Sequence, residues 1–552
     1  MKKEAKGFRL IFGYLGIFLM FEGFVTVLPL LILAFYPSEW MVFWDFLIPG
    51  LVGIVLGAVL FFLLVAGRPK GHFARNDDAL LLVLLWLCAI VLGSFPFYLT
   101  RFPALNQGLA SLNLDMSYSE SFFESMSGYS ATGLTVLPTQ VFLDASAYNL
   151  TLYPAAHVFL FHRALMQFVG GVGLVLLVAS ALSDRYNLKL YFAEGHNDKL
   201  MPNLGKSAKL IFGIYFGYIL IGTISLWLAG MPPFDAFVHA TAALATGGFS
   251  TRSTSLLYFA GVDGTHLEAT VLPVNSIAIE IISIVLMLLG ATNFVLHTFL
   301  LTGKWKQFFK DIEIRFALIA LFFFTMGCTL STMYLYQNSA GAATGLDFWN
   351  SLRYNVFNAV TSLTTTGFTN YPSLKSLGEV AIFSGILLMG IGGGVGSTAG
   401  GIKQYRLSLL LKDFQYSIRY HFASTREVNP HPVYRLGELK EEDDSSSSEA
   451  HNYALLYIVF FLTGAMVLMF MPGIGVVEAT YEYMSALSGT GIDIIGYSNY
   501  KLNYATWYPL LLWILSFAMF IGRLEILPLY YAGRRLTHRL RHFRRKSAIE
   551  EA

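Results

Sequence analysis

The stretch SLTTTGFTN at residues 362–370 sets three threonines against a glycine in a chain that is otherwise rich in Leu, Ile, Phe and Val. Similar phrases occur at three other places, as SATGLT, ATGGFS and SGTGID. Polar, glycine-bearing segments are costly within a membrane unless they are buried in protein or line a watery cavity. Their spacing and their surroundings therefore carry most of the information on the fold.

The composition is that of a polytopic membrane protein. The chain has 552 residues, 55% of them hydrophobic and 13% charged, and its mean hydropathy is +0.57. These values lie far outside the range of soluble globular domains. The first apolar stretch, residues 8–36, is long enough to span a bilayer and has no clear cleavage site, so we expect it to remain as a helix. Cys88 and Cys328 lie in apolar runs and indicate neither a disulfide framework nor a metal site.

A helix needs roughly 20 apolar residues to cross the hydrocarbon core, and about ten stretches of this chain meet that requirement. The sequence therefore predicts an all-α integral membrane protein with ten transmembrane helices. The Thr/Gly phrases end shorter, mixed segments that lie between these spans and are too short and polar to cross. The expected spans are residues 8–36, 43–66, 79–100, 155–183, 208–229, 273–302, 316–336, 374–391, 453–471 and 505–532.

The four phrases align on one glycine each, and these glycines are separated by 115, 119 and 124 residues. A bulky residue stands ten positions before each glycine, a polar one nine before and a small one six before. This register predicts four pseudo-symmetric repeats of helix, pore loop and helix after an N-terminal helix pair. The glycines are Gly133, Gly248, Gly367 and Gly491; the bulky residues are Phe123, Val238, Phe357 and Tyr481; the polar ones are Glu124, His239, Asn358 and Glu482; the small ones are Ser127, Ala242, Thr361 and Ser485.

The basic residues test this topology independently. Ten spans that start from an inside N-terminus leave 30 of the 37 Lys and Arg residues in cytoplasmic segments. This bias fits the positive-inside rule, and it holds only if all four Thr/Gly segments enter and leave by the outer face. We therefore expect four re-entrant loops in a protein whose N- and C-termini are both cytoplasmic.

Four re-entrant loops around one axis would form a cation pathway. A short helix that runs inward places its carbonyl end, with about half a negative charge, near the axis. The glycine permits backbone angles that turn carbonyl oxygens towards the pore. A ring of such oxygens replaces the hydration shell of a monovalent cation.

Several longer phrases resemble one known family. They are FDAFVHATAALATGGFST (234–251), HRALMQFVGGVGLVLL (162–177), GGGVGSTAGGIKQYR (392–406) and FIGRLEILPL (520–529). Together with the Thr/Gly phrases they resemble the pore-forming subunit of the Trk/Ktr potassium uptake systems over nearly the whole chain. Two extra spans before the first repeat make the chain more similar to the Trk branch than to the eight-span Ktr branch.

The resemblance implies that each repeat contributes one strand of a selectivity filter. The first-strand glycine, which the family associates with selection of K⁺ over Na⁺, is Gly133 here. Strand two departs from the pattern with Gly247 in place of Thr, and strand four departs with Asp493. Because Gly247 removes a hydroxyl, we expect fewer strong ion sites than in a filter of four equivalent strands. The implied K⁺ residues are Ala131, Thr132, Gly133, Thr246, Gly247, Gly248, Thr365, Thr366, Gly367, Gly489, Thr490 and Gly491.

A second glycine cluster, GIGGGVGSTAGG at residues 390–401, carries seven glycines in twelve residues and cannot form a stiff helix. The resemblance implies an intramembrane gate loop, residues 390–403, that must move before ions pass. A nucleotide-binding loop fits poorly, because Ile402 stands where a P-loop lysine belongs. A glycine-lined helix contact is an alternative. The implied gate residues are Gly392, Gly393, Gly394, Gly396, Gly400, Gly401, Lys403 and Arg523.

Three of the ionisable residues within the expected spans stand out, namely Arg523, Glu280 and Arg163. A charge at the depth of Arg523 usually faces a cavity or a partner, and the resemblance places it near the gate loop; snorkelling to the inner surface is the alternative. Glu525 is a poor partner for it, because residues i and i+2 of a helix do not face each other. Glu280 and Arg163 have no partner that the sequence identifies.

The chain also carries two polar segments outside the expected spans. The acidic, serine-rich segment at 437–450 is predicted to be disordered. The basic tail at 534–552 is expected to lie on anionic lipid headgroups, and a docking role is the alternative. The expected units are residues 1–70 (N-terminal helix pair), 71–190, 191–310, 311–436 and 451–533 (repeats one to four), 437–450 (linker) and 534–552 (tail).

The sequence thus predicts a K⁺ uptake protein of the bacterial cytoplasmic membrane rather than an enzyme, with no organic cofactor and no nucleic-acid partner. Besides membrane lipids, the resemblance implies a homodimer and a cytoplasmic ring of nucleotide-binding regulatory subunits. The ion-translocating subunit of an ATP-driven potassium pump shares the four-repeat architecture and is an alternative. A membrane-embedded enzyme is a further one, but the spans hold no catalytic spacing such as H-E-x-x-H.

Overall fold

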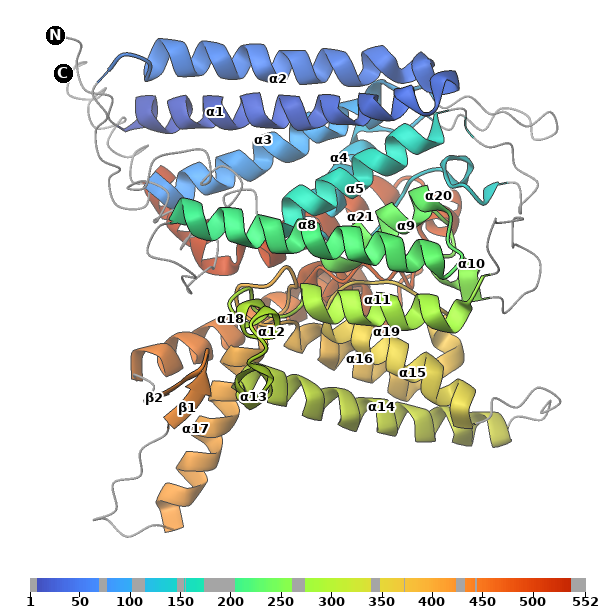
Figure 1. Cartoon of the computed structure of the whole chain (residues 1–552), viewed down its shortest axis with the longest axis vertical. Helices are drawn as coiled ribbons and strands as arrows, with labels where there is room; N and C mark the ends of the chain where they lie inside the picture. Colours follow the sequence, from blue (N-terminus) through green and yellow to red (C-terminus); the bar gives the residue numbers. More distant parts are fainter. Residues whose placement is uncertain are drawn as a thin grey trace.

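The structure is a computed structural model, and the part of the chain that it describes is almost entirely helical, with one short two-stranded hairpin. In the view of Figure 1 most of the long helices run roughly parallel across the molecule, and the hairpin and the 19-residue helix at residues 404–422 project from one end. The described residues are 7–68, 77–101, 115–145, 153, 155–172, 204–260, 274–338, 348–371, 373–422, 432–441 and 444–537.

The elements fall into α-helices, four short 3₁₀ segments and one antiparallel strand pair. The α-helices are α1 (Phe8–Val27), α2 (Phe43–Leu64), α3 (Asp77–Leu99), α4 (Tyr118–Tyr129), α5 (Ala156–Val172), α8 (Leu204–Leu228), α9 (Pro233–Leu244), α10 (Leu257–Ala260), α11 (Ser276–Gly290), α12 (Leu296–Leu301), α13 (Trp305–Lys310), α14 (Ile312–Asn338), α15 (Phe348–Leu363), α16 (Glu379–Ile391), α17 (Gln404–Phe422), α18 (Asp444–Met469), α19 (Val476–Ser488), α20 (Tyr497–Asn503) and α21 (Tyr508–Leu524). The 3₁₀ segments are η1 (Leu28–Ala34), η2 (Pro37–Val42), η3 (Thr139–Val141) and η6 (Leu374–Leu377), and the strands are β1 (Pro432–Arg435) and β2 (Glu438–Glu441).

Glycines bring α1 and α2 into close contact. A Cβ atom on Gly16 of α1 would lie 2.5 Å from the carbonyl oxygen of Gly57 in α2. A Cβ atom on Gly23 would likewise collide with the carbonyl oxygen of Gly50. Small residues at a helix interface let two backbones approach closely inside a membrane. The N-terminal helix pair predicted from the sequence therefore packs through its glycines.

Seven of the ten expected spans coincide with helices that are long and apolar enough to cross a membrane, if the bent pair Tyr508–Leu524 and Ile526–Thr537 counts as one span. The angle within that pair is 100°. The expected spans at 155–183, 273–302 and 374–391 differ. There the described helices are α5, α11 and α16, with 17, 15 and 13 residues. Residues 173–183 lie outside the described part of the chain.

A short helix precedes each of the four Thr/Gly phrases. These helices are α4, α9, α15 and α19, and they contain 12, 12, 16 and 13 residues. A helix of that length does not cross a hydrocarbon core, which takes roughly 20 residues. Each short helix follows a long one, α3, α8, α14 or α18, and precedes another helix, α5, α11, α16 or α21. The same order of elements thus occurs four times.

The prediction of a disordered linker at 437–450 is wrong for the residues described there. Strand β2 covers Glu438–Glu441 and pairs antiparallel with β1, and α18 already begins at Asp444. Two contacts explain this order: the Leu436 N–H donates to Asp311 Oδ2 at 2.8 Å, and Arg435 lies 3.7 Å from Glu313. An acidic, serine-rich composition predicts disorder only where no such partner is available. The tail beyond residue 537 lies outside the described residues.

Candidate functional site

Each short helix is followed by a non-helical segment that contains one Thr/Gly phrase. These segments, strands one to four in chain order, are not part of a β-sheet, and their backbone is unusual. Two residues in every strand have a positive φ, the aligned glycine and the residue two positions before it. At three of the four earlier positions the residue is not glycine, so the left-handed conformation carries strain of about 1–3 kcal/mol, a pattern found at functional sites. The paired φ values are 53° and 99° (Ala131, Gly133), 50° and 70° (Thr246, Gly248), 52° and 87° (Thr365, Gly367), and 72° and 84° (Gly489, Gly491).

The four strands close into a ring. A Cβ atom on each aligned glycine would collide with a backbone carbonyl of the next strand, so strand one contacts strand two, two contacts three, three contacts four, and four returns to one. No side chain fits at these positions unless the neighbouring backbone moves. The colliding pairs are Gly133 with Gly247 O, Gly248 with Thr366 O, Gly367 with Thr490 O, and Gly491 with Thr132 O.

Paired hydroxyls support three of the four strands. In strand one, Ser130 Oγ lies 2.6 Å from Thr132 Oγ1. In strand three, the corresponding distance between Thr364 Oγ1 and Thr366 Oγ1 is 2.8 Å. Strand four repeats the arrangement with Ser488 and Thr490, 2.7 Å apart. All of these side chains are buried, so the hydroxyls satisfy each other next to the strand backbone.

Strand two lacks these hydroxyls, and Gln167 of α5 takes their place. Gln167 Nε2 donates to the carbonyl oxygen of Gly247 at 2.5 Å, and its Oε1 accepts from the Phe249 N–H at 3.3 Å. The side chain is fully buried. The sequence predicted the loss of a hydroxyl at Gly247 but did not identify this replacement, because Gln167 belongs to a different repeat. Its position in the phrase HRALMQF was the available signal.

The small residues six positions before the glycines form hydrogen bonds to the chain that follows each short helix in three of the four repeats. The Gly133 N–H donates to Ser127 Oγ at 3.0 Å, and the Gly367 N–H donates to Thr361 Oγ1 at the same distance. In strand four Ser485 Oγ instead donates to the carbonyl oxygen of Ile492 at 3.0 Å. The hydroxyl at the end of each of these short helices therefore holds the strand that follows it.

The polar residues nine positions before the glycines hold the outgoing chain. Glu124 accepts from the Val136 N–H at 2.9 Å, and Glu482 accepts from the Ile494 N–H at 3.0 Å. In the other two repeats His239 Nε2 lies 2.8 Å from Ser250 Oγ, and Tyr371 donates its hydroxyl to Asn358 Oδ1 at 3.0 Å. One polar position therefore folds the chain back onto its own short helix in all four repeats.

Arg163, which had no partner in the sequence interpretation, joins the first two repeats. Its Nε donates to Glu124 Oε1 at 2.8 Å and its Nη1 donates to the carbonyl oxygen of Ser250 at 3.2 Å. Its guanidinium carbon also lies 3.8 Å from the ring centroid of Phe249. Both charges are almost completely buried, so each depends on the other for compensation.

The glycine cluster forms a non-helical loop between α16 and α17, from Gly392 to Lys403, as the sequence predicts. This loop touches the strands directly. Thr246 Oγ1 donates to Thr398 Oγ1 at 3.0 Å, and the Gly400 N–H donates to Thr365 Oγ1 at 2.8 Å. A Cβ atom on Gly400 would also collide with the carbonyl oxygen of Ser488. The loop therefore lies against strands two, three and four. The alternative interpretation of the glycine cluster, a glycine-lined contact between two helices, does not fit these contacts.

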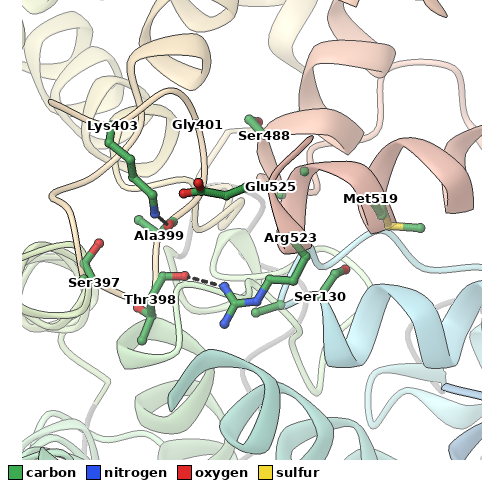
Figure 2. Close-up of a pocket in the computed structure, with 15 residues that line it drawn as sticks. Ser130, Ser397, Thr398, Ala399, Gly401, Lys403, Ser488, Met519, Arg523 and Glu525 are labelled. Atoms are coloured by element: carbon green, nitrogen blue, oxygen red, sulfur yellow. Dashed lines mark hydrogen bonds between the residues drawn. The ribbon is translucent and has the colours of Figure 1, made fainter. Parts of the chain in front are cut away.

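Arg523 connects this loop to the first repeat. Its Nη1 donates to the carbonyl oxygen of Thr398 at 3.0 Å, and its Nη2 donates to the carbonyl oxygens of Gly170 and Gly171. These contacts with the loop favour the interior position of Arg523 over snorkelling to the surface. Figure 2 shows Arg523 extended towards Thr398, and on the same side of the loop Lys403 Nζ reaches the carbonyl oxygen of Ala399.

A cavity of about 40 Å³ lies between the loop and the strands. Residues of strand one, strand four, the loop and α21 line it (Figure 2). Of its charged residues, Arg523 and Lys403 are basic, and Glu525 is paired with Arg406 through contacts of 2.9 and 3.1 Å. The space admits only a few water-sized particles.

The other ionisable residues that the sequence singled out also have partners. Glu280 of α11, which appeared alone, forms a two-contact ion pair with Arg353 of α15 at 2.7 and 2.8 Å. Asp493 in strand four accepts from the Ile495 and Gly496 N–H groups, both at 2.8 Å. Asp493 therefore shapes the turn after strand four.

The twelve predicted filter residues and the predicted gate residues thus meet at one place in the fold, where the four strands contact each other in a ring and the loop lies against three of them. The fold is that of a multi-pass helical membrane protein in which a glycine-rich loop lies against a ring of four glycine-bearing strands. Such a ring of backbone carbonyls is typical of cation transport proteins. The chain is a member of the TrkH family of cation transport proteins, which it matches over residues 46–536. The predicted membership of the Trk branch is confirmed.

Individual relatives extend over most of the chain. A protein of Methanocaldococcus jannaschii described as an uncharacterized cation transporter is 28% identical over 541 residues, which cover 96% of this chain and 95% of that protein. The Trk system potassium uptake protein TrkH of Salmonella typhimurium is 28% identical over 495 residues, 87% of this chain and 89% of that one. The crystal structure of the potassium transporter TrkH from Vibrio parahaemolyticus matches with a TM-score of 0.73 at 24% identity, covering 95% and 98% of the two chains. At that identity the structural likeness shows the fold.

Proposed function

We propose that the chain takes up K⁺ across the bacterial cytoplasmic membrane through a filter of backbone carbonyls. The filter consists of the twelve residues 131–133, 246–248, 365–367 and 489–491. The ring of strands carries this proposal, because four strands that contact each other in sequence enclose one axis. Carbonyl oxygens around such an axis replace the hydration shell of a monovalent cation.

The gate in this proposal is the loop at residues 390–403 with Arg523. Three filter strands and the loop are joined by hydrogen bonds or by direct backbone contact, and Arg523 adds a positive charge beside the cavity. A cation that leaves the filter meets this charge and a space of about 40 Å³. The loop and Arg523 therefore have to move before ions pass.

The proposed architecture has ten membrane spans and four pseudo-symmetric repeats after an N-terminal pair, with the domain boundaries predicted from the sequence except at the linker. Two of the spans, α11 and α16, are then short helices continued by non-helical chain, which a membrane tolerates where protein surrounds it. The excess of Lys and Arg in the expected cytoplasmic segments supports cytoplasmic termini. A homodimer and a ring of cytoplasmic nucleotide-binding subunits complete the proposed assembly, by analogy with the family.

Rubidium and sodium flux into proteoliposomes tests the proposal. We expect the unaltered chain to pass Rb⁺ in preference to Na⁺, and Gly133→Ser to lose that preference, because its side chain would collide with the carbonyl oxygen of Gly247. Gly213→Ser is the matched control, since a Cβ atom there meets nothing within 4 Å.

Two outcomes would contradict the proposal. Absence of flux through the unaltered chain would favour an enzyme, and an unchanged ion preference in Gly133→Ser would remove the filter assignment. Co-purification with a P-type ATPase would instead identify a pump subunit, although membership of the TrkH family disfavours that reading.

A further inference from the structure

A large apolar cavity lies outside the ring of strands, among α8, α11, α12, α13 and α14. Its volume is about 510 Å³, within the range of about 300–1,000 Å³ that is typical of ligand sites. Nearly all of its lining is hydrophobic. Residues at its mouth, Leu301, Trp305, Phe309 and Leu318, are each more than half exposed. Such exposure is stable only if apolar molecules cover these side chains.

Helix α13 gives the mouth of this cavity two chemically different faces. Trp305, Phe308 and Phe309 line the cavity, at the i, i+3 and i+4 spacing of one helix face. Lys306 and Lys310 share a different face and are exposed. A short helix with an aromatic face and a basic face is suited to the boundary between headgroups and acyl chains.

Within the described part of the chain, no acidic side chain pairs with the basic side chains around α13. Lys304, Lys306, Lys310 and Arg315 are all exposed, and none of them forms an ion pair with any residue that the structure describes. The two nearby acids, Asp311 and Glu313, are buried, and both contact the β1–β2 hairpin, at Leu436 and Arg435. The rim of the cavity therefore carries uncompensated positive charge.

The charge distribution predicts that this rim lies at the level of the cytoplasmic headgroups. Residues 303–315 belong to one of the basic segments that the charge distribution assigns to the cytoplasm. Figure 1 shows α12 and α13 at the same end of the molecule as α17 and the hairpin, which carry another of those segments. Anionic lipids lie at this depth, and basic pockets between membrane helices bind their headgroups.

We propose that the cavity binds an anionic phospholipid, with one acyl chain inside the apolar cavity and the phosphate at Lys304, Lys306 and Lys310. The inner end of the cavity reaches Thr364 and Gln404. Gln404 Nε2 donates to the carbonyl oxygen of Gly392 at 2.9 Å, so an acyl chain in the cavity touches a residue that holds the glycine loop. That coupling to the gate rests on the proposed uptake of K⁺, whereas lipid binding rests only on the predicted membrane orientation.

Quenching of Trp305 fluorescence by brominated lipids tests the site directly. The full chain is reconstituted in phosphatidylcholine vesicles with increasing fractions of phosphatidylglycerol brominated on its acyl chains, and in parallel with brominated phosphatidylcholine. The contribution of Trp305 is the difference between the unaltered chain and Trp305→Phe. We expect half-quenching of this contribution at an about fivefold lower fraction of phosphatidylglycerol than of phosphatidylcholine, because each surface lysine favours an anionic headgroup.

Three variants separate headgroup from acyl chain. The triple variant Lys304→Gln, Lys306→Gln, Lys310→Gln should lose the preference for phosphatidylglycerol. Ala317→Phe, which fills the cavity, should weaken quenching by both lipids. The control triple variant Arg68→Gln, Arg419→Gln, Arg534→Gln removes the same charge from other expected cytoplasmic segments and should keep the preference.

Several results would overturn this proposal. Equal quenching by the two lipids would indicate only annular contact, and a preference that survives the lysine triple variant would place the headgroup elsewhere. If the arginine control variant also lost the preference for phosphatidylglycerol, that preference would come from the overall surface charge and not from this site. Absence of Trp305 quenching in the unaltered chain would mean that another occupant, such as a second copy of the chain, covers the cavity. Full quenching in Ala317→Phe would place the acyl chain outside it.

Discussion

Single polar side chains hold the ring of strands together, and each acts on a backbone group. Strands one and three use the hydroxyls of Ser127 and Thr361, which accept from the glycine N–H groups at 3.0 Å. Strand two has Ala242 at that position and depends on Gln167 from outside its own repeat. The four strands are therefore similar in path but differ in support, as the departure at Gly247 predicts.

Replacement of Gln167 by Leu should weaken strand two selectively. The change keeps the size of the side chain but leaves the buried Phe249 N–H without its acceptor, at a cost of about 1–3 kcal/mol. We expect a lower thermal midpoint in detergent and a reduced preference for Rb⁺ over Na⁺ in proteoliposomes. Gln140→Leu, at a partly exposed position in η3, is the control. An unchanged ion preference in Gln167→Leu would argue against a role of strand two in selection.

Replacement of Arg523 by Gln should loosen the loop. The variant loses hydrogen bonds from a charged donor to the carbonyl oxygens of Thr398, Gly170 and Gly171. Each such bond contributes roughly 1.5–3 kcal/mol, so we expect Rb⁺ uptake by the isolated chain to rise about tenfold. Arg534→Gln, an exposed residue on the segment after the bend, should have no effect. Equal uptake by the Arg523 variant and the unaltered chain would contradict a role in closing the pathway.

Ion pairs connect the short helices to their neighbours at the scale of elements. Arg163 of α5 binds Glu124 of α4, and Arg353 of α15 binds Glu280 of α11. Four further acids near the short helices are paired as well: Asp115 with Arg101, Glu120 with Lys501, Asp235 with Arg252, and Glu478 with Lys375. Among the described residues, the charged side chains near the short helices therefore form ion pairs that hold neighbouring elements in place.

The buried pair of Glu124 and Arg163 should be far more sensitive than an exposed one. Glu124→Gln leaves the Arg163 charge buried without compensation, which typically costs about 3–5 kcal/mol. We expect a large drop in the thermal midpoint, and partial recovery in the double variant Glu124→Gln, Arg163→Met. Lys375→Ala removes the half-exposed partner of Glu478 and should cost at most about 1 kcal/mol. Similar effects of the two single variants would contradict the burial argument.

At the scale of the whole molecule, the ring is held by contacts that cross all four repeats. Gln167 and Arg163 of α5 hold strand two, the glycine loop contacts strands two, three and four, and Arg523 of α21 reaches back to the first repeat. None of the repeats forms its part of the site alone. The site therefore exists only in the assembled fold.

The membrane orientation is a prediction about the whole molecule, and cysteine labelling can test it. In a background without Cys88 and Cys328, we expect Asn499→Cys in α20 to react with an impermeant maleimide from outside intact cells. Arg419→Cys in α17 should react only after the membrane is opened. Both positions are exposed, so accessibility of the side chain itself does not limit the reaction. The reverse pattern would invert the predicted topology.

The sequence alone determined the membrane class, the positions of most long helices, the four glycine-bearing strands and the glycine loop. Those features repeat locally, since apolar length, helix-breaking glycine and charge bias are properties of neighbouring residues. Only the tertiary structure decided the partners of Arg163, Glu280 and Gln167, because those contacts join residues 39 to 87 positions apart. It also decided that residues 438–441 pair as a strand, since their order comes from contacts with Asp311 and Glu313, more than a hundred residues earlier in the chain.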